Sequence, residues 1–150
     1  MNHYNENLNK FLNDVFHDIL RLEEAALSKG DFKNLSINEM HVIEAVHDGN
    51  LEGLHTMTEI SAKLMVTGST LTTSVKTLEQ KGYLTRSKLK EDKRRVNVAL
   101  TPLGTKAYDK HKEFHKKLVN NVADNLNLDE LTALENALSI LHTFFNTMKS

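Results

Sequence analysis

Apolar residues recur along most of this chain at spacings of three and four, which is the period of an amphipathic helix. The first stripe runs from Leu8 to Ala26 and predicts a helix over residues 5–28, which Gly30 would end in a left-handed conformation. Further phenylalanines and leucines widen this stripe beyond one packed face. The surplus predicts that the helix is buried against a second copy of the chain.

Two capping boxes follow, in which a Ser or Thr and a Glu three residues later satisfy each other's backbone amides. Ser36–Glu39 predicts a helix over residues 37–47, and Thr56–Glu59 predicts a second, short helix. A third helix is expected over residues 67–81, because its apolar residues keep the helical period and Gly82 is placed at its C-cap.

The period of the pattern then changes from helix to strand. Residues 96–100 alternate between apolar and other side chains, which is typical of a half-buried strand. Residues 83–89 are its predicted antiparallel partner, and residues 90–93 are the tip of the hairpin.

Two more helices are predicted after the hairpin. Pro102 opens one that runs to about residue 124, since proline is favoured in the first turn of a helix. The last helix begins at a box-like sequence at Asn127 and carries an apolar stripe from Leu131 to Met148.

The resulting order is α-α-α-α-β-β-α-α, mainly helical with one small antiparallel hairpin. This order predicts a winged helix-turn-helix over residues 36–101, which is a DNA-reading fold. Residues 1–35 and 102–150 are expected to form a helical dimerisation region in one continuous fold, so that the protein is an obligate-type homodimer.

The charge of the chain is unevenly distributed, although its formal net value is only −1. Residues 1–60 carry 4 basic and 11 acidic side chains, residues 61–117 carry 14 and 5, and residues 118–150 carry 1 and 4. A basic middle segment is the footprint of a surface that binds a polyanion. Charge alone fits a solvated, lysine-rich surface equally well.

The third helix and the hairpin add the residue types that DNA recognition requires. Small hydroxyl residues at a helix start allow its backbone to approach the major groove, and a basic hairpin can reach the adjoining minor groove. A two-fold dimer would then read an inverted-repeat operator in double-stranded DNA. The predicted DNA-binding residues are Thr67, Gly68, Ser69, Thr70, Thr72, Thr73 and Lys76 on the helix, and Lys88, Lys90, Lys93, Arg94 and Arg95 on the hairpin.

Several strings of this sequence resemble the MarR family of bacterial regulators, and the resemblance spans about residues 8–148. It implies a dimer formed by the N-terminal helix and the last two helices. It also adds Asp92 to the DNA-binding residues, because the aspartate of the hairpin is thought to orient basic groups while Arg94 enters the minor groove. The strings are Glu59–Leu64, Leu71-Thr72, Leu78–Leu84, Asp92–Arg94 and Leu100-Thr101.

Other strings are most similar to members of this family that repress fatty-acid biosynthesis. They are Ile37–His41, Leu64–Thr67, Thr72–Val75 and His111–Lys116. This similarity implies a repressor whose corepressor is a long acyl chain on acyl carrier protein. The acyl chain is expected in an apolar pocket lined by Phe16, Leu20, Met40, His41, Ile43 and Phe114.

The histidines offer an alternative, which is a zinc-responsive regulator of the same family. His111 and His115 are four residues apart, so both imidazoles lie on one face of a helix, and His41 with Glu24 would complete a metal site if the helices meet. An isolated pair of this kind is more often solvated or lines a pocket, and the chain has no cysteine. A third alternative, a winged helix that contacts only proteins, is disfavoured by the basic hairpin.

Other functional classes find no support in the sequence. It has no nucleophile–base string, P-loop or glycine-rich dinucleotide loop, so we expect neither catalysis nor a cofactor. It shows no signal-peptide pattern and no apolar run near the ~20 residues that span a membrane. We therefore expect a cytoplasmic protein without a membrane partner.

Overall fold

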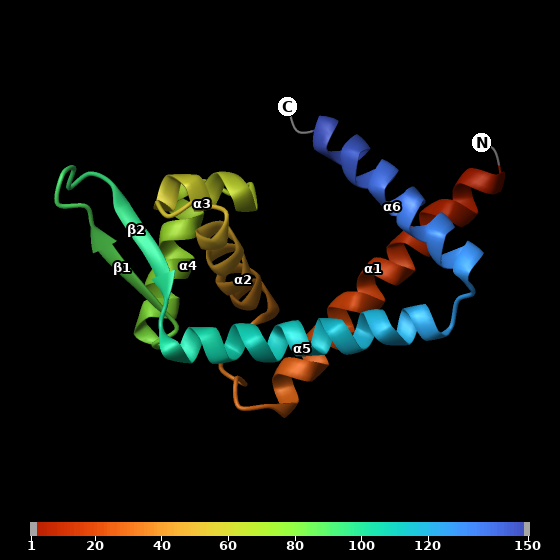
Figure 1. The fold of residues 1–150 in the computed structure, drawn as a ribbon, viewed down its shortest axis with the longest axis horizontal. Helices are drawn as coiled ribbons and strands as arrows, with labels where there is room; N and C mark the ends of the chain where they lie inside the picture. The colour runs from red at the N-terminus through yellow and green to blue at the C-terminus, as the bar shows by residue number, and fades with distance from the viewer. Residues whose placement is uncertain (1–2, 149–150) are drawn as a thin grey trace. The chain divides into compact units, whose positions relative to one another are not determined.

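The computed structural model describes residues 3–148, with side chains from Glu6 onward, and the elements follow the predicted order (Figure 1). The first two and last two residues of the predicted dimerisation region lie outside the described residues. The helices are α1 (His3–Lys29), α2 (Ile37–Leu51), α3 (Met57–Leu64), α4 (Gly68–Gln80), α5 (Pro102–Asp124) and α6 (Leu128–Thr147), and the strands are β1 (Leu84–Lys88) and β2 (Val96–Leu100).

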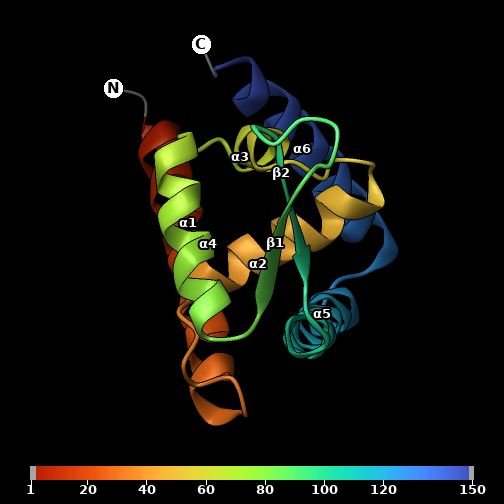
Figure 2. The ribbon, with the colours of Figure 1, turned by 90° about the vertical axis from the view of Figure 1, so that its left-hand side faces the viewer.

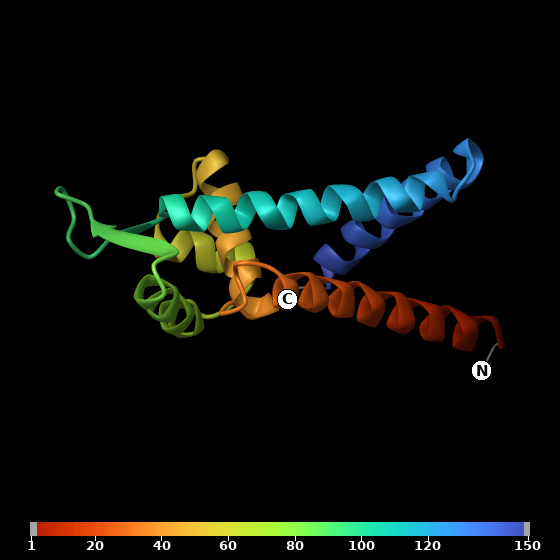
Figure 3. The same cartoon turned by 90° about the horizontal axis from the view of Figure 1, so that it is seen from below.

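The chain forms two compact units, residues 1–112 and 113–150. The helix α5 is uninterrupted and contributes its first half to one unit and its second half to the other (Figure 3). The second unit adds α6, which begins as predicted at a capping box formed by Asn127 and Glu130.

One hydrophobic core lies in the first unit and joins α2, α3, α4 and the hairpin. Complete burial of a large apolar side chain stabilises a fold by ~1.5–3 kcal/mol, so these residues hold the three short helices at fixed angles. The largest fully buried members are Met40, Ile43 and Val46 from α2, Ile60 from α3, Leu71, Val75 and Leu78 from α4, and Val98 from β2.

The hairpin pairs β1 with β2 in antiparallel register, with Leu84 opposite Leu100. The backbone amide of Val98 donates to the carbonyl of His55 at 2.9 Å, and this bond ties β2 to the chain just before α3. The far end of the hairpin projects away from the helices (Figure 1). It lies on the same side of the first unit as α4 (Figure 2), so a helix and a wing are presented together.

The helix α2 is longer than predicted, because it continues through Gly49 to Leu51 instead of ending near residue 47. A Cβ atom on Gly49 would lie 2.5 Å from Cδ1 of Ile60. Glycine is therefore needed here for the close approach of α3, and its role as a helix breaker is overridden by packing.

The prediction for Gly30 was wrong. The described glycines with positive φ are Gly53 and Gly82, and Gly30 is not one of them. Turns after α1 carry Phe32 towards the core instead, where its ring packs edge-on against Tyr83 with the centroids 6.2 Å apart. Gly82 has a φ of 88° directly after the C-cap of α4, as its predicted role in ending that helix requires.

Gly104→Ala should strongly destabilise the first unit. The new Cβ would lie 2.2 Å from the backbone oxygen of Tyr83 and 3.3 Å from Cβ of Leu100, so α5 would have to shift away from the hairpin. We expect a loss of unfolding free energy of ~1–3 kcal/mol or more, as for other overpacked sites. Urea unfolding followed by circular dichroism would measure it.

Gly68→Ala is the control for this prediction, because a Cβ on Gly68 would meet no atom within 4 Å. Alanine is favoured over glycine in a helix by up to ~1 kcal/mol, so this variant should be at least as stable as the parent. Equal stability of the Gly104→Ala variant and the parent would contradict the close packing of α5 on the hairpin.

Large apolar side chains remain exposed on α1 and α6, and α6 buries none of its described side chains. The most exposed examples include Phe11, Phe16, Ile140 and Phe145, each at least half exposed. Within residues 3–148, none of the helices combines the length and apolar character that crossing a bilayer would demand.

Candidate nucleic-acid interface

The candidate recognition helix α4 starts after a tight turn made by a left-handed residue, Met65, whose φ is 59°. Thr67 is the N-cap of α4, and its hydroxyl oxygen accepts a hydrogen bond from the amide of Thr70 at 3.1 Å. The predicted contact residue Thr67 therefore has a structural task as well, because it orients the first turn of the helix.

The predicted contact face of α4 is open to solvent. Thr72 is half-buried, and its hydroxyl donates to the carbonyl of Gly68 at 2.8 Å, while Thr73 donates to Ser69 at 3.1 Å. These bonds use the hydroxyl protons and leave the oxygens facing outward as acceptors. The exposed predicted residues are Thr67, Gly68, Ser69, Thr70, Thr73 and Lys76.

The wing carries its predicted basic residues in exposed positions, and Asp92 organises the turn at its tip. The carboxylate of Asp92 accepts from the backbone amide of Arg94 at 3.1 Å and from its Nε at 3.3 Å. The side chain of Arg94 is 93% exposed, so it extends into solvent from a fixed backbone. Lys88, Lys90, Lys93 and Arg95 are exposed as well.

An open pocket of about 380 Å³ lies between the start of α3, the middle of α4 and the wing. Three arginines line it, together with Thr72 and residues of α3. Two of them, Arg94 and Arg95, were predicted to bind DNA, but Arg86 was not. The alternation of side chains along β1 could have predicted the position of Arg86, because Arg86 follows the buried Leu84 by two residues and lies on the same face of the strand.

The C-terminal end of α4 is held by an ion pair to α2. Lys81 Nζ lies 2.9 Å from both carboxylate oxygens of Glu39, and Tyr83 donates from its hydroxyl to Asn34 Oδ1 at 2.6 Å. Partial burial would raise the pKa of Glu39, but hydrogen bonds from Ser36 and Lys81 outweigh it, and the pKa lies below its usual value. Glu39 thus stays ionised and fixes the recognition helix against α2.

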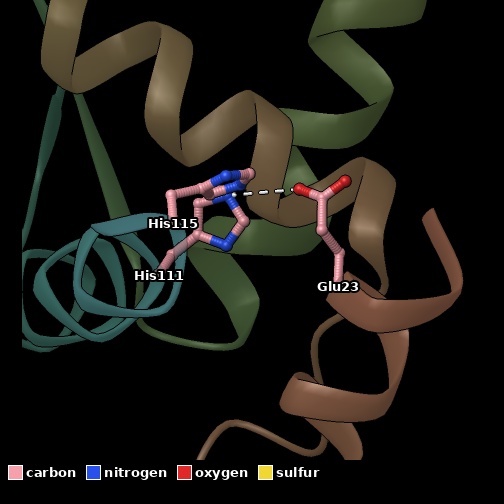
Figure 4. Close-up of side chains that lie close together, drawn as sticks. All are labelled: Glu23, His111 and His115. Carbon is pink, nitrogen blue, oxygen red and sulfur yellow. Dashed lines mark ion pairs between the residues drawn. The ribbon is translucent and has the colours of Figure 1, made fainter. Parts of the chain in front are cut away.

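A second polar cluster joins α1, α2 and α5 inside the first unit. Oε2 of the buried Glu23 lies 3.2 Å from Nε2 of His41. The same oxygen lies 3.5 Å from Nε2 of the buried His111 (Figure 4). Nε2 of His111 also lies 3.1 Å from Oε2 of Glu44, and the hydrogen bond from His111 lowers the pKa of Glu44 despite its partial burial.

This cluster corrects one predicted metal ligand. Glu24, the acidic residue expected beside His41, is exposed and lines a shallow depression on α1 with Asp14 and His17. The helical period instead turns Glu23 towards α2. His115 follows His111 by one turn of α5, as predicted, and belongs to the second unit.

The residues predicted to line a ligand pocket lie in different surroundings. Met40 and Ile43 are fully buried members of the core, and His41 is tied to Glu23. Phe16 is 60% exposed, and Leu20 lines the depression on α1. Phe114 belongs to the second unit, where its ring packs edge-on against His115.

Comparison with known proteins places this geometry in a family. Residues 35–96, which contain α2, α3, α4 and β1 and reach the first residue of β2, match the model of the MarR family. The chain is 31% identical over 96 residues to an uncharacterized HTH-type transcriptional regulator, YhjH, of Bacillus subtilis. That match covers 64% of this chain and 53% of YhjH, so it spans about half the length of this curated relative.

Two solved structures extend the similarity over the whole chain. Streptococcus pneumoniae FabT in complex with DNA is 34% identical with a TM-score of 0.89, and the match covers 96% of this chain and 99% of FabT. A mutant of MarR from E. coli complexed with operator DNA is 25% identical with a TM-score of 0.72, and the match covers 94% and 99%. The chain therefore belongs to the MarR family of winged helix-turn-helix transcriptional regulators, as its sequence strings predicted.

Proposed function

We propose that this protein is a homodimeric repressor of fatty-acid biosynthesis genes, which binds an inverted-repeat operator with long-chain acyl-acyl carrier protein as corepressor. The observation that carries the proposal is the similarity to FabT, solved with DNA, over nearly the full length of both chains. The strings that resemble fatty-acid regulators lie in α2, in the turn between α3 and α4, in α4 and in α5 of this chain.

The exposed groups of the first unit support the DNA part of the proposal. The start of α4 offers small side chains and a backbone that can approach base edges, and Lys76 is placed one turn later for a phosphate. Arg94 at the wing can reach an adjoining minor groove. Because several cations on each subunit would displace counterions, binding should weaken steeply as salt concentration rises.

The apolar surfaces of α1 and α6 support the dimer. These helices expose large side chains along much of their length, and contiguous apolar surface of this kind marks a protein interface. A two-fold dimer would present two recognition helices about one turn of DNA apart.

The acyl ligand is proposed to select a different arrangement of the first unit. Met40 and Ile43 are packed in the core as described, so an acyl chain that contacts them must open the packing around α2. A ligand shifts DNA affinity only if it binds one arrangement better than the other. The acidic carrier protein would dock on lysines of α5, namely Lys110, Lys112, Lys116 and Lys117, all of which are exposed.

The test is a titration of operator DNA in the presence of long-chain acyl carrier protein, unacylated carrier protein or free fatty acid. We expect operator affinity to rise with the acylated carrier only, by about 5- to 150-fold, which is the usual range of allosteric coupling. By linkage, operator DNA should tighten binding of the acylated carrier by the same factor. Equal affinity in all arms would exclude this corepressor.

Zinc response is the second candidate, and the cluster around Glu23 favours it. Carboxylate and imidazole are zinc ligands, and Glu23 lies within 3.5 Å of Nε2 of both His41 and His111. The same titration with zinc in place of the carrier protein separates the two functions. The metal function would be established instead if operator affinity changes with zinc concentration, if this zinc response is lost in Glu23→Gln, and if the acylated carrier protein has no effect.

A further inference from the structure

An ion pair joins the recognition helix to the wing. Oε1 of Glu79 on α4 lies 2.5 Å from Nε of Arg86 on β1. Each side chain is 29% exposed, so the pair is partly shielded from solvent and is screened less than a fully exposed pair. An arginine in this setting can hold a carboxylate with directional hydrogen bonds as well as charge.

The sequence pattern explains why these two side chains meet. Glu79 follows Thr72 by seven residues, so both lie on the face of α4 next to its buried stripe. Arg86 follows the buried Leu84 by two residues and therefore points to the same side of β1. Thr72 and Arg86 line one pocket between α4 and the wing, and Glu79 contacts Arg86 about two helical turns beyond Thr72.

The position of this pair along the hairpin matters because anchoring weakens towards the tip. At the base Leu84 is buried, and Val98, which pairs with Arg86 across the hairpin, is bonded to His55. Lys88, at the end of β1, is exposed, and beyond it the chain leads to Arg94. Arg86 is thus the middle anchor of β1, between a fixed base and a tip that must reach a groove of DNA.

We propose that Glu79 and Arg86 are positioning residues that fix the angle between the wing and the recognition helix, so that α4 and Arg94 engage adjoining grooves together. This inference rests on the proposed DNA binding. A wing held at the correct angle before binding loses little conformational entropy in the complex, whereas a loose wing must be ordered at the expense of affinity.

The charge of Glu79 makes the inference easy to distinguish from simple electrostatics. Removing a negative charge from a DNA-binding unit should strengthen binding to any polyanion, if attraction to phosphates is the only effect. Loss of a positioning residue should instead weaken binding to the operator. Glu79→Gln therefore changes affinity in opposite directions under the two explanations.

The experiment measures the dissociation constant of the full-length protein for an operator that the parent has selected from random-sequence DNA. We expect Glu79→Gln and Arg86→Gln each to weaken operator binding on the order of 10-fold, and the double variant to be no weaker than Arg86→Gln alone, because contacting residues are not additive. Binding of Glu79→Gln to non-specific DNA should not weaken. Glu91→Gln, which removes one charge from the exposed wing tip, is the matched control and should bind as well as the parent or more tightly.

Two further measurements separate positioning from general damage to the fold. Thermal unfolding and light scattering should show that the variants keep the stability and the dimer of the parent. The reversed pair Glu79→Arg with Arg86→Glu should recover operator affinity relative to either single variant. In hydroxyl-radical footprints, protection of the DNA by the wing should be lost in the single variants and regained in the reversed pair.

The outcomes distinguish this inference from the proposed function. A parent that selects no DNA sequence contradicts the proposed function, and this inference with it. A parent that binds its operator, together with a Glu79→Gln variant that binds more tightly or a double variant whose losses simply add, overturns the inference alone.

Discussion

An Arg94→Ala variant should lose tight operator binding while it keeps its fold and its oligomeric state. The side chain is 93% exposed, so its removal takes away no packing. A specific arginine contact contributes ~1–3 kcal/mol, and the proposed dimer has two wings, so we expect operator affinity to fall on the order of 100-fold. Fluorescence anisotropy with labelled operator at fixed salt concentration would measure the loss.

Lys76→Ala is the comparison for Arg94→Ala, because Lys76 is also exposed but is placed for a phosphate. Its loss should weaken binding to all sequences alike and reduce the slope of log affinity against log salt by about one. Operator binding by Arg94→Ala that matches the parent would show that the wing does not contact DNA as proposed.

A Leu138→Glu variant should be monomeric at micromolar concentration and should lose operator binding. Leu138 is at the centre of the apolar stripe of α6 and is 54% exposed in the single chain. A charge in a buried dimer interface is strongly unfavourable unless it is paired. Loss of the second recognition helix should reduce affinity by at least 100-fold, since the two half-sites are no longer bound together.

Ser139→Glu adds the same charge at the next, exposed position of α6 and should leave the dimer intact. Light scattering and analytical ultracentrifugation would follow both variants. A parent protein that is itself monomeric at these concentrations would refute the dimer, and with it the expected inverted-repeat operator.

Most of the fold could be predicted because local signals and packing agree in it. The boxes at Ser36 and Thr56 start α2 and α3 as expected, and the change from a period of three and four to a period of two marks the hairpin. The errors fell on glycines. Gly49 and Gly30 were interpreted from their own conformational freedom, whereas packing against residues further along the chain, Ile60 for Gly49 and Tyr83 for the turn after Gly30, determines the path.

Less of the candidate site could be predicted from the sequence, because it depends on contacts between side chains of different helices and strands. Residues such as Lys76 and Arg94 could be predicted as exposed from residue type and element order alone, and both are exposed. The partner of His41 could not, since Glu23 and Glu24 are neighbours and a helix rotation of about 100° decides which one faces α2. The ion pair between Glu79 and Arg86 was missed because the periods of α4 and β1 give the face on which each side chain lies, but not which residue of the other element it contacts.

The ion pair between Glu39 and Lys81 has a consequence for how freely this sequence can vary. The carboxylate of Glu39 also accepts from the amide of Ser36 at 2.9 Å, so one group completes a helix cap and fastens a second helix. Aspartate is one methylene shorter and cannot reach both partners. Glutamine could still accept the hydrogen bond of the cap but would lose the charge that pairs with Lys81. Among related sequences, substitutions at positions 36, 39 and 81 should therefore occur together, as a linked set of three.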